Sequence, residues 1–251
     1  MMPSNAKAWE KLIQSCKYFF SKNSICVADI LNLDSKNNLG LSLGSYPWFR
    51  ITNLTVKLWI INIIVSYSNT LTLIFPKLYK TDFKKLHLWN QTISYNDFLF
   101  ISSNVGKIFL YRTIVKTEDG LIVPLEKLVK ALPKIKYISF CDDHLSSMIT
   151  SNTVTEFLTI PHFSKISKII LREIPETFDI EKCFAFIKKN KITKVDIFFN
   201  HFLSDAYKIR VESIIDEILQ TENHDYKVPE IAFEGCDRQK WRKLQSLFYK
   251  D

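Results

Sequence analysis

Glycine and proline are scarce in this sequence, which has 5 glycines and 8 prolines among its 251 residues. So few glycines leave little room for a loop whose backbone amides cradle a phosphate. The sequence also lacks the Gly-x-Ser-x-Gly and His-Glu-x-x-His motifs of hydrolases and metalloproteases. Since 47% of the residues are hydrophobic and 24% are charged, we expect one large folded domain or two small ones.

The cysteines are few, odd in number and far apart in the sequence: Cys16, Cys26, Cys141, Cys183 and Cys236. None belongs to a Cys-x-x-Cys pair, and no two of the five histidines stand at a metal-ligand spacing. This pattern argues against a disulfide framework and against a zinc site. We therefore expect no metal and no cofactor, and a reducing compartment, the cytoplasm or the nucleus.

A long hydrophobic run is missing as well. The most apolar stretch, residues 58–75, has polar residues in its middle and ends at Pro76. A bilayer-spanning helix needs about 20 mostly apolar residues. The stretch therefore predicts a buried strand followed by a helix, and we expect no membrane segment. The N-terminus has no short apolar segment after a basic start, so we also expect no signal peptide.

The net charge is +8, and no run of like charges accounts for it. A positive excess favours acidic partners through long-range attraction. Two interpretations of the lysines stay open. Those near helix C-termini would be favoured there by the helix dipole alone, whereas a strip of lysines beside aromatic side chains would bind nucleic acid.

Catalytic groups are hard to find in this sequence. Asp142-Asp143-His144 is the nearest approach to an acid–base cluster. It follows a predicted strand, where a solvated turn is the more common structure. No pairing of a nucleophile with a base is visible elsewhere, so we expect no enzymatic activity.

One short pattern recurs along the chain: a charged residue followed by apolar residues at alternate positions. The period-two alternation predicts half-buried strands, and the intervals between copies run from 22 to 36 residues. The charged residues that open the copies are Lys57, Lys85, Lys107, Lys136, Lys168, Lys194 and Glu230.

Helical segments are predicted between these strands, at 70–79, 94–103, 124–131, 153–160, 179–190 and 204–220. Four of them begin with a side chain that can accept a hydrogen bond from the first turn: Ser94, Thr153, Asp179 and Ser204. Further helices at 8–20 and 237–249 would cover the two ends of the array, because an open end leaves apolar surface in water.

A strand–helix unit of this size cannot bury its own apolar face. Stacking the units side by side predicts an α/β solenoid, with a mainly parallel sheet on one side and helices on the other. A doubly wound sheet with helices on both faces is the alternative. The short helices and the recurring pattern favour the solenoid.

The repeated strands resemble a degenerate leucine-rich repeat array, in which Phe, Ile and Tyr replace many leucines. The N-terminal segment Leu12-x-x-x-Cys16-Lys17-Tyr18-Phe19 resembles the last helix of an F-box. Together they resemble the F-box-associated families, in which a short F-box precedes a repeat-like domain. This resemblance implies an F-box-like remnant and capping segment at 1–53 and a leucine-rich-repeat-like solenoid at 54–251.

The same resemblance implies a substrate-recognition component of a ubiquitin ligase. Leu12, Cys16, Lys17 and Phe19 would be what remains of the adaptor-binding surface. The Leu-Pro start and the first helices of an F-box are not seen, since only Met1–Ala8 precede this segment. Most of the surface that grips a Skp1-like adaptor is therefore expected to be missing.

The alternation of the strands predicts which side chains lie on the sheet surface away from the helices. We expect a basic row beside an aromatic row there, a combination typical of interaction surfaces. The expected partner-binding residues are Trp59, Lys85, His87, Trp89, Lys107, Phe109, Tyr111, Tyr137, Lys168 and Arg172. The sequence thus predicts a non-catalytic scaffold that binds an acidic or peptide-like protein partner, and a basic nucleic-acid-binding module is the alternative.

Overall fold

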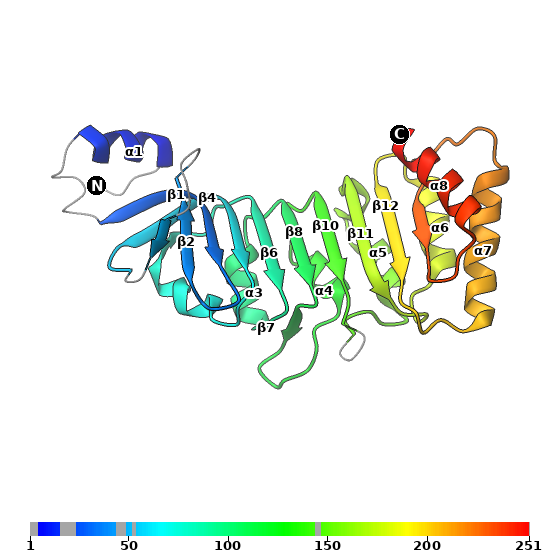
Figure 1. Ribbon diagram of the computed structural model, residues 1–251, viewed down its shortest axis with the longest axis horizontal. Coiled ribbons are helices and arrows are strands. Elements are labelled where there is room, and N and C mark those ends of the chain that lie inside the picture. The colour runs from blue at the N-terminus through cyan, green and yellow to red at the C-terminus, as the bar shows by residue number, and fades with distance from the viewer. Residues whose placement is uncertain (1–4, 16–23, 44–48, 52–53, 144–146, 251) are drawn as a thin grey trace.

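The protein is seen here in a computed structural model that describes residues 5–15, 24–43, 49–51, 54–143 and 147–250. Its centre is an open, mostly parallel sheet of 11 strands with helices packed against it (Figure 1). The strands of this sheet are β1 (Ile25–Leu33), β2 (Leu39–Ser42), β3 (Phe49–Ile51), β4 (Lys57–Ser66), β5 (Leu78–Lys80), β6 (Lys85–Trp89), β8 (Lys107–Tyr111), β10 (Tyr137–Cys141), β11 (Lys168–Ile174), β12 (Lys194–Phe199) and β13 (Glu230–Ala232).

The seven strands predicted from the recurring pattern are confirmed as parallel neighbours. They follow one another across the sheet in chain order, from β4 through β6, β8, β10, β11 and β12 to β13. The first residues of five of these strands form one row across the sheet. The five strands are β6, β8, β10, β11 and β12. Since neighbouring strands lie about 4.8 Å apart, each position of the pattern becomes a straight line of side chains across the sheet.

Strand β4 does not follow this register, which corrects the expected place of the first copy of the pattern. Ile63, and not Lys57, pairs with Lys85 at the start of β6. The first half of β4 pairs instead with β5, which puts Leu58 opposite Leu78. Strand β4 has ten residues and so has room for two neighbours along one edge.

The N-terminal residues add three strands to the same sheet. Strand β1 is parallel to β4, whereas β2 is antiparallel to β1 and β3 is antiparallel to β2. The turn between β1 and β2 depends on Asp34, whose carboxylate accepts hydrogen bonds from the backbone amides of Lys36 and Asn38. Asn37 lies in this turn with φ of 61°, a left-handed conformation that asparagine tolerates. The sheet therefore runs without a break from the N-terminal residues into the repeated strands.

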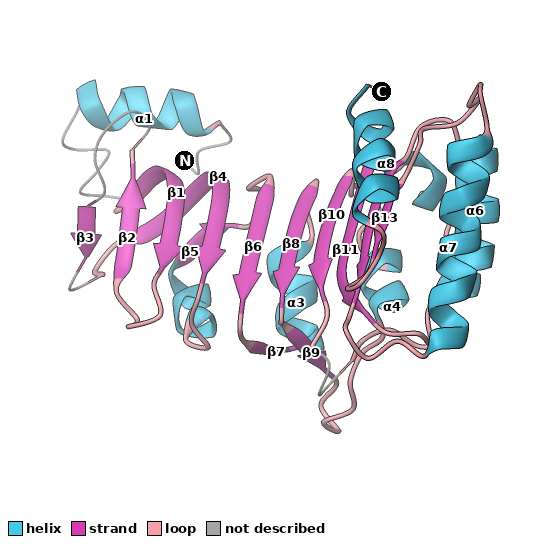
Figure 2. Ribbon diagram, turned by 45° about the vertical axis from the view of Figure 1, so that its right-hand side comes forward, coloured by secondary structure: helices cyan, strands magenta, loops and turns pink. Residues whose placement is uncertain are grey.

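Helices cover one face of the sheet and enclose the main core with it (Figures 1 and 2). Leu88, Leu110, Phe140, Leu171 and Ile197 point from successive strands into this core, and each is at most 2% exposed. The helical elements on this face are η1 (Leu71–Lys77), α3 (Tyr95–Ser102), α4 (Leu125–Lys130), α5 (Thr153–Thr159), η2 (Phe163–Lys165), α6 (Ile180–Lys189) and α7 (Asp205–Gln220). No helix among the described residues is both long and apolar enough to cross a membrane.

Three of the four predicted helix caps are confirmed. The side chains of Ser94, Asp179 and Ser204 accept hydrogen bonds from the amides of Asp97, Lys182 and Tyr207. The prediction for Thr153 is wrong, because Asn152 stands before the helix and Thr153 is its first residue. The Thr153 hydroxyl is buried and donates to the Glu126 carboxylate of α4 over 2.8 Å.

A second, two-stranded sheet lies at the ends of the repeated strands. It pairs β7 (Thr92–Ser94) with β9 (Ile114–Lys116) in parallel. A tight turn follows β9 directly, where Thr117 and Leu121 are hydrogen-bonded and Gly120 has φ of 79°. That φ favours glycine over any residue with a side chain.

Two helices lie against the opposite face of the sheet, one toward each end (Figures 1 and 2). Helix α1 (Ala6–Ser15) packs Trp9 against Ile25, Val27 and Trp59 in a separate small core. Helix α8 (Arg238–Lys250) buries Leu244 and Phe248 beside β13 and α7. Helices expected at 8–20 and 237–249 are thus found at Ala6–Ser15 and Arg238–Lys250, and residues 16–20 lie outside the described residues. Helix α1 does not cover the end of the array as expected, because β2 and β3 lie beyond it, and both helices occupy part of the sheet surface that the other helices leave bare.

Candidate functional site

The sheet face away from α3 to α7, which we call the open face, carries the side chains that alternate with the core residues. Between α1 and α8 it is formed by β6, β8, β10 and part of β11 (Figure 2). Nine of the ten predicted partner-binding residues lie here, on these four strands. They are Lys85, His87, Trp89, Lys107, Phe109, Tyr111, Tyr137, Lys168 and Arg172.

A row of lysines crosses the open face where the strands begin. Lys85 pairs with Lys107, Lys107 with Tyr137, Tyr137 with Lys168, and Lys168 with Lys194. Within the described ranges, no carboxylate lies at ion-pair distance from any of these four ammonium groups. Neighbouring like charges about 4.8 Å apart repel each other. The row is therefore a place where an anionic group gains favourable interactions.

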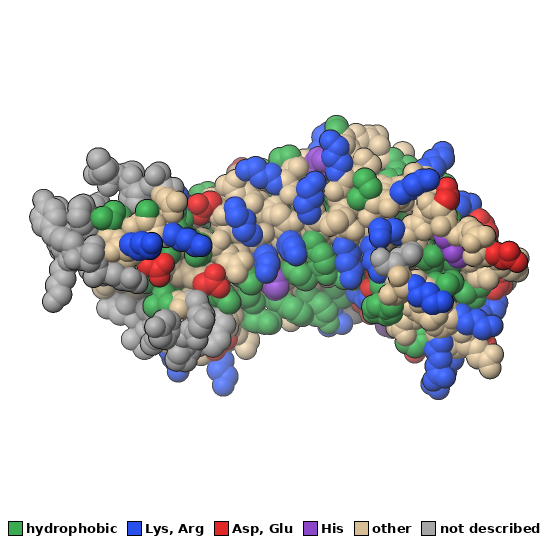
Figure 3. Space-filling model, turned by 90° about the horizontal axis from the view of Figure 1, so that it is seen from above, with side chains coloured by type: hydrophobic (Ala, Val, Ile, Leu, Met, Phe, Trp, Pro, Cys, Tyr) green, Lys and Arg blue, Asp and Glu red, His purple; other side chains and the backbone are tan. Residues whose placement is uncertain are grey.

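The view onto this edge of the sheet shows how the charges are distributed. In Figure 3, Lys and Arg side chains lie along the middle of the molecule and also toward both ends, whereas Asp and Glu side chains lie toward the two ends. A charged surface of one sign attracts a partner of opposite sign over a distance of about 8–10 Å at physiological salt. The middle of this surface therefore favours an acidic partner, since basic side chains there are not accompanied by acidic ones.

Aromatic rings form two ladders across the same strands. In the first, Tyr67 stacks on Trp89 with ring centroids 5.5 Å apart, and Trp89 meets Tyr111 at 4.7 Å. In the second, the His87 ring lies 4.0 Å from Phe109. Phe109 in turn lies 5.0 Å from Tyr137, and the ring planes in both ladders are inclined by only 25–43°. Each ring therefore shields a face of its neighbour, and the ladders offer mainly ring edges to a partner.

Two polar atoms of the ladders have no hydrogen-bond partner. They are His87 Nε2 and Trp89 Nε1, and both are buried among the rings. Burial, together with the charge of Lys85, lowers the pKa of His87 to about 4. His87 is thus a neutral ring at neutral pH and adds no charge to the lysine row. A buried donor without an acceptor is costly, by about 1–3 kcal/mol.

The open face changes character where it meets α8. Arg172 makes two hydrogen bonds of 2.5 Å to the Asp196 carboxylate on the next strand. Glu230 is in register with Asp196, and burial raises its pKa. Glu230 accepts a hydrogen bond from Gln245 of α8 over 3.2 Å. The acidic side chains of this face are thus already engaged by an arginine or by α8.

Trp59 does not belong to the open surface, which corrects the prediction. It is 1% exposed, packs in the small core beneath α1 and lies under the Lys80 ammonium at 4.4 Å. Its indole Nε1 donates to Asp82 over 2.9 Å. The strand alternation places Trp59 on the correct face, but α1 and the segment after β5 cover it.

Of the predicted adaptor-binding remnant, Leu12 alone lies in the part of the chain that the structure describes. It belongs to α1 and is 41% exposed. Cys16, Lys17 and Phe19 fall outside the described residues. The structure thus offers no geometry for an adaptor-binding surface.

Sequence reasoning missed several residues of the open face. Tyr67 extends the first aromatic ladder from just beyond β4, and Asp196 binds Arg172. Phe248 reaches the lysine row from α8, with its ring 4.2 Å from the Lys194 ammonium. Asp196 stands at an alternate position of its strand, so the recurring pattern could have identified it. The contact between Phe248 and Lys194 joins residues that are distant in sequence, so no local sequence pattern predicts it.

The solvated turn expected at Asp142-Asp143-His144 is wrong for Asp142, which is buried and has a structural role. Asp142 is 1% exposed, and its carboxylate accepts hydrogen bonds from the Met148 amide and the Ser147 hydroxyl. It therefore organises the loop that follows β10. Asp143 is half-buried, and His144 lies outside the described residues.

The thiols and the carboxylates give no sign of metal chemistry. Burial raises the pKa of Cys141 to about 11 and that of Cys183 to about 12, so both thiols stay protonated at neutral pH. Among the described residues, no three His, Cys, Asp or Glu side chains gather where they could hold a metal ion.

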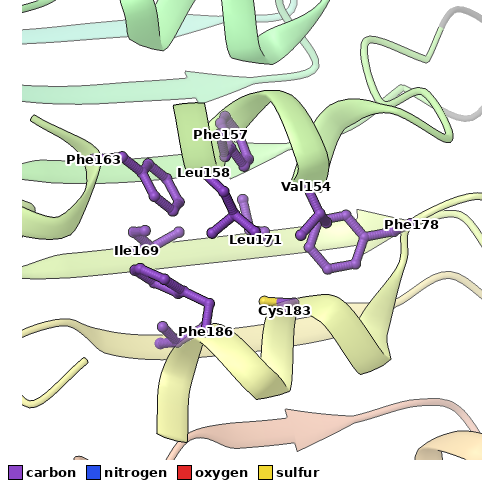
Figure 4. Close-up of a pocket in the computed structure, with 10 residues that line it drawn as sticks. Val154, Phe157, Leu158, Phe163, Ile169, Leu171, Phe178, Cys183 and Phe186 are labelled. Carbon is purple, nitrogen blue, oxygen red and sulfur yellow. The ribbon is translucent and has the colours of Figure 1, made fainter. Parts of the chain in front are cut away.

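A small hollow lies on the helical side of the sheet, between α5, α6 and β11 (Figure 4). Its lining is apolar, with Phe157, Phe163 and Phe186 around it, and its volume is about 20 Å³. A cavity of that size holds about one water molecule, and a water needs polar partners. The hollow is thus a packing gap rather than a ligand site.

The open face therefore remains the one surface in the described part of the chain that combines unneutralised charge, clustered rings and unpartnered polar atoms. Comparisons of the chain with protein-family models, with curated proteins and with solved structures gave no match.

Proposed function

We propose that this chain is a non-catalytic protein-interaction scaffold whose open face binds an acidic protein partner. The observation that carries the proposal is the lysine row, which has no carboxylate at ion-pair distance within the described ranges and lies beside the two aromatic ladders. Acidic side chains of a partner would neutralise Lys85 and Lys107, and apolar side chains would pack on the rings. Aromatic residues and arginine are the common anchors of protein interfaces.

We also propose that the array is a solenoid of leucine-rich-repeat type related to F-box substrate receptors. The chain-ordered parallel strands support the solenoid, since each unit places its strand beside the previous one. The link to a ubiquitin ligase depends on the sequence resemblance at Leu12, Cys16, Lys17 and Phe19. Recovery of a Skp1-like adaptor with the purified full chain would support this link, and its consistent absence would count against it.

A basic sheet with aromatic side chains is also a feature of single-stranded nucleic-acid binding, which is the alternative function. Bases stack on exposed ring faces. In the ladders of the open face the rings are 4.0–5.5 Å apart and inclined by 25–43°, so they cover each other's faces. This arrangement favours side chains of a protein over bases.

The test compares three forms of the full chain as baits in quantitative affinity enrichment. They are the wild type, the double variant Trp89→Ala/Tyr111→Ala and the control Phe100→Ala. Phe100 is a 45% exposed ring on α3, on the helical side of the sheet. A partner of the open face should be lost with the double variant and kept with the control.

Thermal unfolding of each bait shows whether the fold is intact. A partner set that is unchanged for a folded double variant would overturn the proposal. Retention on heparin at low salt, combined with bound RNA or DNA and steep loss of binding as salt rises, would instead support the nucleic-acid function.

A further inference from the structure

The C-terminal helix shows how a helix lies on the open face. Trp241 and Arg242 of α8 border the same hollow as Phe198 and Ala232, at the far ends of their strands. Further along α8, Gln245 reaches Glu230, the first residue of β13, and Phe248 reaches Lys194, the first residue of β12. Helix α8 thus runs antiparallel to the strands (Figure 2).

The last turn of α8 ends at the lysine row. The Phe248 ring lies 4.2 Å from the Lys194 ammonium and 5.8 Å from the Lys168 ammonium. The final carbonyl groups of a helix lack internal partners and carry partial negative charge. A pair of lysines on adjacent strands therefore suits the C-terminal end of a helix that carries an aromatic residue.

A second pair of lysines on adjacent strands has the same arrangement. Lys85 and Lys107 begin β6 and β8 in the row that contains Lys168 and Lys194. Beyond them, the strands carry His87, Phe109 and Trp89, which form an apolar bed with the unpartnered indole Nε1. In the part of the chain that the structure describes, α1 and α8 cover the two sides of this pair but not the pair itself.

The width of the uncovered sheet fits one helix. Strands β6, β8 and β10 lie between the strands beneath α1 and those beside α8. Three strands span about 14 Å at a spacing of about 4.8 Å, and a helix with its side chains is about 10–12 Å across. Helix α8 itself has basic and no acidic side chains between Arg238 and Lys250. A helix beside it therefore gains from acidic residues.

We infer that β6 and β8 bind an acidic, amphipathic helix of a partner protein, with its C-terminal end at Lys85 and Lys107, antiparallel to the strands as α8 is. This inference rests on the proposed function and names the shape and the direction of the partner. The helix packs apolar side chains on the His87–Phe109 pair.

The probes are two synthetic libraries of peptides of about 14 residues, roughly 20 Å long as a helix. Both have the same content of Glu, Leu, Phe and Ala. In one, lactam bridges between residues four apart enforce the helix, and in the other regularly placed prolines prevent it. Each library is selected on the full chain, and the dissociation constants of the selected peptides are measured by fluorescence anisotropy.

The charge requirement is tested with Lys85→Glu/Lys107→Glu and with the matched control Lys127→Glu/Lys130→Glu. The control changes the net charge equally, and its lysines are exposed on α4, on the helical side. We expect helical peptides to bind, with affinity reduced roughly tenfold or more by the first variant and unchanged by the control.

The direction is tested with a nitroxide at either end of a selected peptide. A C-terminal label should broaden the amide signal of Lys107 more than that of Tyr111, at the other end of β8. An N-terminal label should do the reverse.

The outcomes separate this inference from the proposed function. Binding by the proline library alone, or equal binding to both lysine variants, would overturn the helix site while leaving the open face a protein-binding surface. Failure of both libraries would also overturn the helix site. Binding of oligouridylate in place of either library would overturn the proposed function as well.

Discussion

The guanidinium of Arg172 and the carboxylate of Asp196 face each other across β11 and β12, joined by two hydrogen bonds of 2.5 Å. Glu230 extends the group to β13, in register with Asp196. Arg172 thus pairs with Asp196, whose side chain is only 9% exposed, and its positive charge also acts on Glu230. This relationship marks the border between the uncovered part of the open face and the part beneath α8.

Removing the arginine should destabilise the fold because it leaves Asp196 beside Glu230 without a cation. We expect Arg172→Met to lower the free energy of unfolding by about 2–3 kcal/mol, the size of a hydrogen bond to a charged group. In an Asp196→Asn background the same change should cost clearly less. Urea denaturation of the wild type, the two single variants and the double variant measures the coupling between Arg172 and Asp196. Equal losses of unfolding free energy in both backgrounds would contradict this coupling.

His87 should make the fold less stable in acid. Its pKa is about 4 in the folded chain and 6.5 in the unfolded chain. Between these values the unfolded chain binds more protons, so the His87 contribution to stability is present above pH 6.5 and is lost as the pH falls toward about 4. We expect His87→Phe to gain stability relative to the wild type between about pH 7 and about pH 5. A difference that stays constant over this range, measured by urea unfolding, would exclude the effect.

Asp142 should change the stability of the fold with pH in the opposite direction to His87. Burial is the main cause that raises its pKa from 3.8 to about 6. As the pH rises through this window, the unfolded chain loses its proton first, so the stability that Asp142 contributes at low pH is lost. Asp142→Asn should therefore gain stability relative to the wild type between about pH 4 and about pH 7. The prediction fails if the two unfolding free energies change in parallel with pH.

Thr153 should stabilise the contact between α4 and α5. Its buried hydroxyl donates to the Glu126 carboxylate, which is itself only 7% exposed. Thr153→Val keeps the shape of the side chain but removes the donor, and we expect a loss of about 1–3 kcal/mol. Thr155→Val, on the exposed side of the same helix, is the control and should change stability little. Thermal unfolding of both variants measures this difference. Similar melting temperatures of the two variants would refute a stabilising role of the Thr153 hydroxyl.

The repeated strands could be predicted from the sequence because their pattern is local. A charged residue followed by alternating apolar residues identifies a strand and its buried face without knowledge of the neighbours. The same reasoning placed Lys85, His87 and Trp89 on one face of β6, and Lys107 and its neighbours on the same face of β8. Parallel pairing in chain order then brings these residues together.

The exposure of Trp59 could not be predicted in this way. Alternation gives the face of a side chain, but not what lies on top of it. Trp59 is covered by α1, about fifty residues away in sequence, and by the β5 segment, which also takes the pairing edge that β6 was expected to use. Contacts of this kind depend on where a distant segment docks.

The antiparallel strands at the N-terminal end have a local signal in the sequence. Asp34 to Asn38 is a run of turn-forming residues between two apolar segments, which is typical of a hairpin. The resemblance to an F-box implies helices near this region instead. The small sheet of β7 and β9 had no comparable signal, since each strand has three residues.

The shared register of β6 to β12 has a consequence for how such a chain can change in length. Gaining or losing one whole unit inside this block would widen or narrow the open face by a single strand spacing and keep the rows of side chains aligned. The antiparallel strands beyond β1 do not share these rows, so units added there would not extend the pattern. A unit added inside this block would therefore enlarge the open face and add one position to its lysine row.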